Sequence, residues 1–276
     1  MKKWIYNSLI IFFATTLLIS IGALGYYYIS GYLQQNRYRE LSQLMGEETT
    51  PRPTLPDPTD GSAPSPTVPA YDYVTVTDPE TGEDVQLLPE FKELYLLNND
   101  IVGWIFIPDT QVDYPVMQTP DSPDYYLKRN FDKASSARGC IYVREQCDVF
   151  APSDNVTIYG HRMKSGAMFG QLDKYFQYDF YDSHRYIYFD TLKELHTYEI
   201  LAVFLTTASQ GEGFAYHMFV DAQSEEEFTD YVNTCKRLSF YDTGVEAAYG
   251  DSLITLSTCE YSQPNGRLVV VAKRIS

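Results

Sequence analysis

The stretch SLITLSTCEYSQPNGRLVVVAK, residues 252–273, contains two strand-like runs joined by a short polar loop. Pro264-Asn265-Gly266 within the loop is a strong turn signal. If the two runs pair as an antiparallel hairpin, Cys259 and Arg267 flank the same loop and meet at one rim of a sheet. The stretch therefore predicts a β-sheet that brings a thiol and a guanidinium together.

This pairing favours nucleophilic chemistry at Cys259. The thiolate is the reactive form of cysteine, and a nearby fixed cation stabilises it and offers donors to a developing oxyanion. The alternative is that Cys259 is a core cysteine and Arg267 a surface arginine. A candidate base near the thiol would favour the catalytic interpretation.

His161 is the candidate base. It follows the apolar run 155–159 through Gly160, so we expect it where a strand ends and a glycine lets the chain turn sharply. An imidazole there can protonate a leaving amine and accept a proton from an incoming one. His184, His196 and His217 lie in polar or loop surroundings and are interpreted as ordinary surface histidines.

Short strand patterns dominate the rest of the region and predict a barrel or a sandwich. The runs 103–108 and 112–117, with a turn at Asp109-Thr110, indicate a hairpin. Further strands are expected at 139–143, 155–159, 185–189, 197–206, 252–258 and 267–273.

Two helices interrupt the strands. Proline at the first turn favours a short helix over 89–98. Ser224 followed by Glu227 is a capping box that predicts a helix to about residue 239, and Cys235 falls on its apolar stripe. We therefore interpret Cys235 as a buried, inert core thiol.

The N-terminal segment 4–29 is apolar and long enough to span a bilayer, and no charged residue occurs between Lys3 and Arg37. Lys2 and Lys3 precede it, so the positive-inside rule places the N-terminus in the cytoplasm and the rest of the chain outside. A cleaved signal peptide is the alternative, because Ala23-Leu24-Gly25 resembles a cleavage site. A retained anchor is favoured by the length of the apolar run.

Composition divides the chain into three parts. Residues 1–30 form the cytoplasmic tip and anchor, and residues 31–70 form a juxtamembrane segment and a stalk rich in Pro, Thr and Ser, which cannot bury enough surface to fold. Residues 71–276 are expected to form one catalytic domain.

Charge and cysteine usage exclude several classes of function. The net charge of −16 argues against a nucleic-acid partner and against tight docking on anionic lipid. Cys140, Cys147, Cys235 and Cys259 form no C-x-x-C pair, and neither they nor the four histidines show metal-ligand spacing. We expect no disulfide framework, no structural zinc and no other cofactor.

Several motifs together resemble the sortase family, specifically class B. These are TLSTC ending at Cys259, NVTIYGH ending at His161, GRLVVVAKR with Arg267 as its second residue, and the upstream runs GWIFIP, DYPVMQ and YYLKRNF. The resemblance covers about residues 104–274. It implies a mainly β fold, a closed barrel of about eight strands with added helices, in which the late helix is similar to a class B insertion.

The resemblance also implies an activity and a site. Sortases cut a C-terminal sorting signal of an exported protein after threonine, hold the acyl group as a thioester, and pass it to an amine. Matched to this chain, Cys259 is the nucleophile, His161 the acid and base, and Arg267 the oxyanion and substrate-orienting group. The backbone amide of Glu260 completes the oxyanion hole, and Tyr159, Ser257, Leu127 and Phe214 line the peptide groove.

The implied partners are exported proteins with sorting signals and an amine acceptor, either a peptidoglycan precursor or a pilin. No aspartate-proline-aromatic lid lies upstream of the barrel and no second span follows Ser276, so the pilus-polymerising class C pattern is not met. The loop between Cys259 and Arg267 is short and departs from the broader pattern. Two other functions stay open, a cysteine hydrolase with the same dyad and a non-catalytic, anchored binding module.

Overall fold

The computed structural model describes residues 2–46, 71–209, 211–262 and 264–276. The chain divides into two units, Met1–Glu40 and Leu41–Ser276, each considered by itself. Most of the predicted stalk, residues 47–70, lies outside the described residues.

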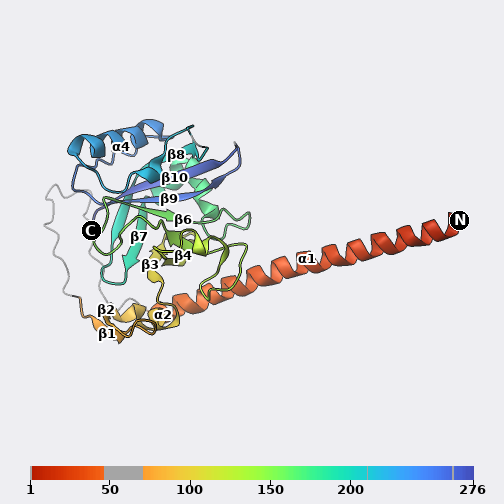
Figure 1. The fold of residues 1–276 in the computed structure, drawn as a ribbon. Coiled ribbons are helices and arrows are strands. Elements are labelled where there is room, and N and C mark those ends of the chain that lie inside the picture. Colours follow the sequence, from red (N-terminus) through yellow and green to blue (C-terminus); the bar gives the residue numbers. More distant parts are fainter. Residues whose placement is uncertain (1, 47–70, 210, 263) are drawn as a thin grey trace. The chain divides into compact units, whose positions relative to one another are not determined.

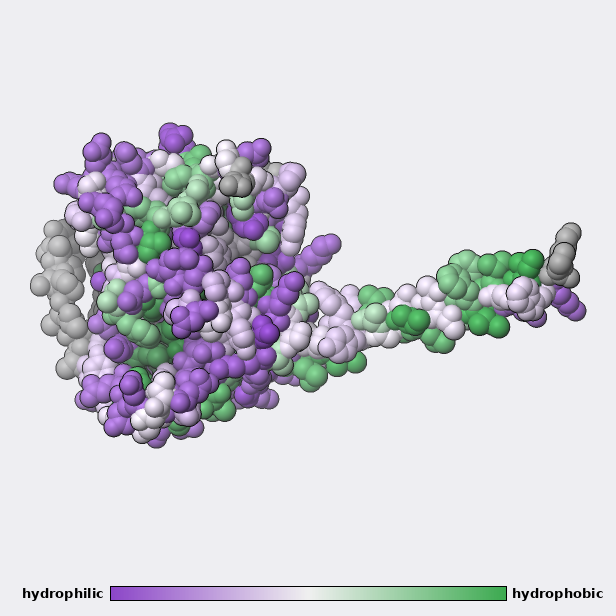
Figure 2. All heavy atoms as spheres, viewed as in Figure 1, coloured by the Kyte–Doolittle hydropathy of each residue, from purple (hydrophilic) through white to green (hydrophobic). Residues whose placement is uncertain are grey.

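Helix α1 (Lys2–Met45) contains the predicted span 4–29 and is long and apolar enough to cross a membrane. Its large apolar side chains, among them Phe12, Leu18 and Ile19, are exposed, and Figure 2 shows hydrophobic residues along much of its length. The helix continues beyond residue 30 to Met45, so the first part of the predicted juxtamembrane segment is helical.

Eight strands of the second unit form a closed barrel in the order β10-β8-β7-β3-β4-β5-β6-β9, which confirms the predicted barrel (Figure 1). Two neighbouring pairs, β4–β5 and β6–β9, are parallel, and the other pairs are antiparallel. The strands are β3 (Ile101–Phe106), β4 (Asp113–Met117), β5 (Ile141–Val143), β6 (Asn155–Tyr159), β7 (Tyr186–Thr191), β8 (Thr197–Thr207), β9 (Leu253–Glu260) and β10 (Gly266–Arg274).

Strand β10 is apolar on both faces because both faces are covered. Its residues from Leu268 to Ala272 are fully buried. Val269 and Val271 join a buried cluster with Phe228 and Val232 of helix α4 (Glu225–Leu238). Burying a side chain of this size contributes about 1.5 to 3 kcal/mol, so α4 and the barrel wall stabilise each other.

The predicted capping box is present at the start of α4, except that the Glu227 carboxylate binds the amide of Gln223 instead of the amide of Ser224. The Ser224 hydroxyl accepts a hydrogen bond from the Glu227 amide at 3.2 Å, and the Glu227 carboxylate accepts one from the Gln223 amide at 2.8 Å. Cys235 is fully buried on this helix, and burial raises the pKa of its thiol to about 12. Its predicted burial in the core is confirmed, and the raised pKa supports the prediction that it is inert.

The predicted helix over 89–98 consists of η1 (Pro89–Phe91) and α2 (Lys92–Leu97). Several short elements were not predicted, because a strand of four residues or a single 3-10 turn shows no periodicity. These are β1 (Val74–Thr77), β2 (Asp84–Leu87), η2 (Tyr125–Lys128), η3 (Gly170–Phe176), α3 (Tyr178–Ser183) and η4 (Tyr216–Met218).

Candidate active site

The β9–β10 hairpin sets Arg267 directly opposite Cys259 in the strand register, which confirms the predicted pairing. Side chains of directly opposed residues lie on the same face of a sheet, about 4.5 to 5.5 Å apart at Cβ. The Cys259 side chain is half-buried. Arg267 donates from Nη1 to the backbone oxygens of Asn265 at 3.3 Å and Gly266 at 3.0 Å, so its own turn holds the guanidinium.

Strand β6 brings His161 to the same end of the barrel. It runs parallel to β9 with Tyr159 beside Ser257, and the Gly160 amide donates to the Ser257 oxygen at 3.1 Å. The Thr258 hydroxyl donates to the Gly160 oxygen at 2.7 Å. If the β6–β9 register is extended by two residues, His161 comes opposite Cys259. Figure 1 shows β6, β9 and β10 side by side.

Gly160 acts through its small size rather than through a special backbone angle. Its φ is not in the left-handed region. A Cβ at this position would lie 2.5 Å from Cδ1 of Ile141 and 2.6 Å from Cδ2 of Phe169. The glycine is therefore required because two apolar side chains occupy the space.

The His161 imidazole is half-buried. Burial lowers its pKa, a hydrogen bond to the Leu127 backbone raises it, and the Lys128 charge lowers it, with a net shift below the ordinary value. The neutral form is therefore favoured. Element η2 supplies the Leu127 backbone, so Leu127 contacts the imidazole as well as being a predicted groove residue.

The other predicted groove residues lie in different surroundings. The Ser257 hydroxyl is buried and shares a 2.5 Å hydrogen bond with the Tyr216 hydroxyl. The Tyr159 ring lies 5.5 Å from the Tyr142 ring. Phe214 packs against Phe204 at 6.1 Å, next to the α4 cluster.

Glu260 ends β9, and its carboxylate is almost completely buried. Burial alone would raise its pKa, but hydrogen bonds from Ser262 and the Tyr261 amide and the charge of Arg162 lower it below the ordinary value. Glu260 therefore stays ionised beside Cys259.

A thiol, an imidazole and a guanidinium at one barrel rim can act together on one carbonyl. In such an arrangement a thiol can serve as the nucleophile, an imidazole can transfer protons, and a guanidinium can donate to a developing oxyanion. Among the residues that the structure describes, no group of three or more His, Cys, Asp or Glu is arranged to hold a metal ion.

Residues 105–275 match the family model described as Sortase domain. The chain belongs to the sortase family. Sortase B of Listeria monocytogenes is 33% identical over 198 residues, which cover 71% of this chain and 78% of that protein. The Staphylococcus aureus sortase B–substrate complex superposes with a TM-score of 0.64 at 30% identity, covering 69% of this chain and 86% of that one.

Sortase B of Bacillus anthracis is 37% identical with a TM-score of 0.62, covering 74% of this chain and 89% of that one. These relatives assign the chain to class B. This sortase is accordingly a cysteine transpeptidase.

Element η4 of this sortase was not predicted from the sequence. It lies beside the predicted triad, which is Cys259, His161 and Arg267. The pKa of Tyr216 is raised chiefly by burial, and the charges of Arg267 and Cys259 also act on it. The pKa of His217 is lowered by burial and by the positive charges of Arg144 and Arg267. A three-residue 3-10 turn gives no periodic signal, so only the tertiary fold reveals Tyr216 and His217 here.

His196 was predicted to be a surface histidine, and this prediction is wrong. His196 is buried, with its Nε2 3.0 Å from a Glu194 carboxylate oxygen and 3.3 Å from Nη1 of Arg274. Its polar neighbours in sequence predict a surface position, but the ring is buried and contacts Arg274, which lies far away in the sequence. His184 and His217 are half-buried.

The four cysteines of this sortase differ in burial. Cys140, Cys147 and Cys235 are buried, and only Cys259 is half-buried. A reagent in solution therefore reaches Cys259 more readily than the others.

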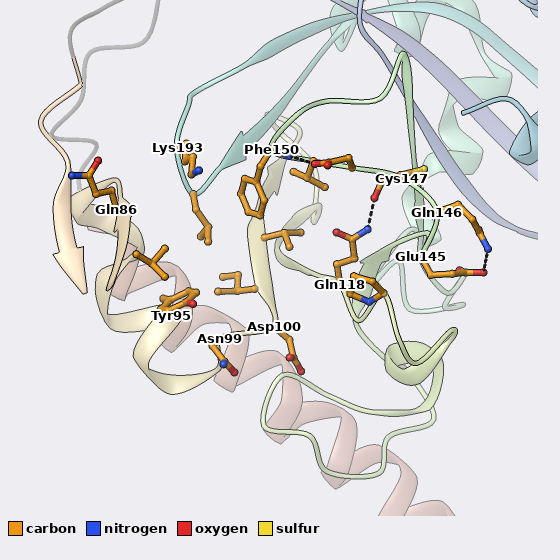
Figure 3. Close-up of a pocket in the computed structure, with 17 residues that line it drawn as sticks. Gln86, Tyr95, Asn99, Asp100, Gln118, Glu145, Gln146, Cys147, Phe150 and Lys193 are labelled. Carbon is orange, nitrogen blue, oxygen red and sulfur yellow. Dashed lines mark hydrogen bonds between the residues drawn. The ribbon is translucent and has the colours of Figure 1, made fainter. Parts of the chain in front are cut away.

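The described residues of this sortase form hollows on its surface. One of about 680 Å³, lined by Gln118, Cys147, Phe150 and Lys193 among others, is shown in Figure 3. Because β5 and β6 run antiparallel, the loop after β5 that lines it lies at the opposite end from His161. Another, of about 640 Å³, is lined by Arg162, the residue after His161, and by Tyr261.

Proposed function

We propose that this class B sortase is a membrane-anchored enzyme that cleaves a C-terminal sorting signal of exported proteins after Thr. It forms a thioester on Cys259 and transfers the acyl group to an amine of a peptidoglycan precursor or a pilin. The observation that carries the proposal is the pairing of Cys259 with Arg267 across β9–β10, together with the β6–β9 register, which ends two residues before His161 and Cys259.

The acylation step uses all three side chains. His161 takes the proton of the Cys259 thiol, and the sulfur attacks the threonyl carbonyl carbon. Arg267 and the Glu260 backbone amide donate to the oxyanion. The C–N bond then breaks, and the imidazolium gives its proton to the leaving amine.

The transfer step reverses these proton movements. The acceptor amine attacks the thioester carbon, and His161 takes a proton from that amine. The C–S bond breaks, and the imidazolium returns the proton to the sulfur, which regenerates the thiol. The thioester keeps much of the energy of the broken amide, so a positioned amine competes with water. The lowered pKa of His161 suits this role, because a neutral imidazole can accept a proton.

We place the sorting peptide along Tyr159, Ser257 and Leu127, with Phe214 at its margin. The hydrogen bond between Ser257 and Tyr216 supports this placement by fixing the wall nearest Cys259. The solved relative from Staphylococcus aureus, which is a complex with substrate, supports a peptide-binding site in this fold.

Helix α1 is the proposed anchor. Its length and apolar composition support a single span, and Lys2 and Lys3 at its start favour a cytoplasmic N-terminus with the barrel outside.

A peptide-library screen with an added amine acceptor tests the function. The full chain in detergent is incubated with quenched C-terminal sorting peptides and triglycine, and the products are identified by mass spectrometry. We expect cleavage after threonine and a product joined to triglycine. Cleavage products that carry only water would instead identify a hydrolase.

The change Cys259→Ala tests the nucleophile. We expect turnover to fall by roughly a thousandfold or more, because no thioester forms, while the melting temperature is kept. An electrophilic thiol probe should label Cys259 well ahead of the three buried cysteines in the parent. Full residual turnover in the variant, or equal labelling of all four thiols, would refute the assignment.

A further inference from the structure

The hydrogen bonds that align β6 with β9 end just before the predicted catalytic residues. The last ones join Gly160 to Ser257 and Thr258. The paired register of β6 and β9 ends at Tyr159 and Ser257. His161 and Cys259 lie beyond these hydrogen bonds, so the β6–β9 ladder does not hold them to each other. Their separation needs another support.

Arg162 and Glu260 supply a contact between the same two segments. Arg162 follows His161, and Glu260 follows Cys259. Nη1 of Arg162 lies 3.5 Å from Oε1 of Glu260, with side-chain exposures of 21% and 9%. Limited access to water reduces screening, so such an ion pair is stronger than one on the open surface.

Each partner is also held from a second side. Nη2 of Arg162 lies 3.1 Å from Oδ2 of Asp173 on η3, and its guanidinium carbon lies 5.4 Å from the centre of the Tyr261 ring. The other carboxylate oxygen of Glu260 accepts from the Ser262 amide at 2.9 Å and from the Ser262 hydroxyl. Both side chains are therefore restrained, and the planar fork of arginine contacts two carboxylates at once.

We propose that Arg162 is a positioning residue that, through Glu260, holds the His161 segment at a fixed distance from the Cys259 segment. It touches neither reacting atom. The inference rests on the proposed roles of Cys259 and His161 and adds a second link beyond the end of the strand ladder. A misplacement of about 1 Å between a nucleophile and its proton donor can lower a rate about a hundredfold.

The barrel offers a closely matched control arginine. Arg185 also lies near two carboxylates, Asp182 at 2.6 Å and Glu199 at 3.6 Å. Its guanidinium carbon lies 5.5 Å from the centre of the Tyr181 ring, and its side-chain exposure is 34%. Removing its charge breaks a similar network outside the predicted triad.

The test compares Arg162→Gln, Glu260→Gln and their combination with Arg185→Gln in the full-length enzyme. The substrate is the quenched peptide with the highest turnover in the library screen. We expect Arg162→Gln to lower kcat by roughly 10- to 100-fold with KM within about twofold of the parent. Arg185→Gln should keep both constants within about twofold.

The double variant should lose no more activity than the worse of its two single variants, because both changes remove one contact. Equal kcat values for Arg162→Gln and Arg185→Gln, a change confined to KM, or losses that multiply in the double variant would each overturn the proposal. If Arg162→Gln does not fold, Glu260→Gln carries the same comparison, since Arg162 then keeps Asp173. A parent that cleaves no peptide, or an active Cys259→Ala variant, would instead sink the proposed function.

Discussion

At the scale of the residue, Arg267 has two features that a lysine cannot reproduce. Its guanidinium donates to two backbone oxygens of its own turn, and it retains further N–H groups directed by a planar fork. The turn contacts fix the side chain, while the remaining donors are available to an oxyanion formed at Cys259. The ammonium group of a lysine is a single point charge, so it could not hold the turn oxygens and donate to an oxyanion in the same way.

We therefore expect Arg267→Lys to lower kcat/KM by roughly 10- to 100-fold, with the melting temperature nearly unchanged. Steady-state cleavage of the screened peptide measures the effect. Arg274→Lys, at the other end of the same strand, is the control and should behave as the parent. Kinetics of Arg267→Lys that match the control would remove Arg267 from the site.

At the scale of the element, the end of β6 depends on the packing beneath it. Gly160 joins the strand to His161, and Ile141 of β5 and Phe169 occupy the space where a side chain would lie. The Phe169 amide also donates to the His161 oxygen at 3.0 Å. A displacement of Phe169 would consequently be transmitted to the backbone of His161.

We expect Gly160→Ala to destabilise the fold by about 1 to 3 kcal/mol and to lower kcat, because the new methyl group overlaps two side chains. Urea unfolding and peptide cleavage measure the two effects. Adding Ile141→Val removes the Cδ1 atom of one overlap and should restore part of both losses. Parent-like stability of Gly160→Ala would show that the packing yields without cost.

At the scale of the whole molecule, buried histidines make stability depend on pH. Burial is the main cause that lowers the pKa of His196, and the Glu194 carboxylate offsets it only in part. The unfolded chain, with a histidine pKa of about 6.5, binds the proton more tightly than the folded one. The contribution of neutral His196 to stability is therefore complete above about pH 6.5 and is lost as the pH falls through the lower, folded-state pKa.

We predict that His196→Gln makes the free energy of unfolding less dependent on pH between about 5 and 7.5. Urea unfolding at several pH values in this window provides the measurement. His161 and His217 titrate in the same direction but are present in both proteins, so the difference between the two slopes isolates His196. Identical slopes would contradict the prediction.

Local patterns in the sequence determined the eight barrel strands, the α4 cap and the β9–β10 hairpin. Each leaves a signal within a few residues of sequence, as with the Pro264-Asn265-Gly266 turn that sets Arg267 opposite Cys259. The family motifs extended this reading to the closed barrel and to the candidate roles of His161, Cys259 and Arg267.

Only the tertiary structure decided which distant segments meet. The parallel pairing of β6 with β9, the position of η4 beside Arg267, the burial of His196 and the ion pair between Arg162 and Glu260 all join segments far apart in the chain. Such contacts leave no periodic trace in either segment, because they depend on how the whole barrel closes and packs.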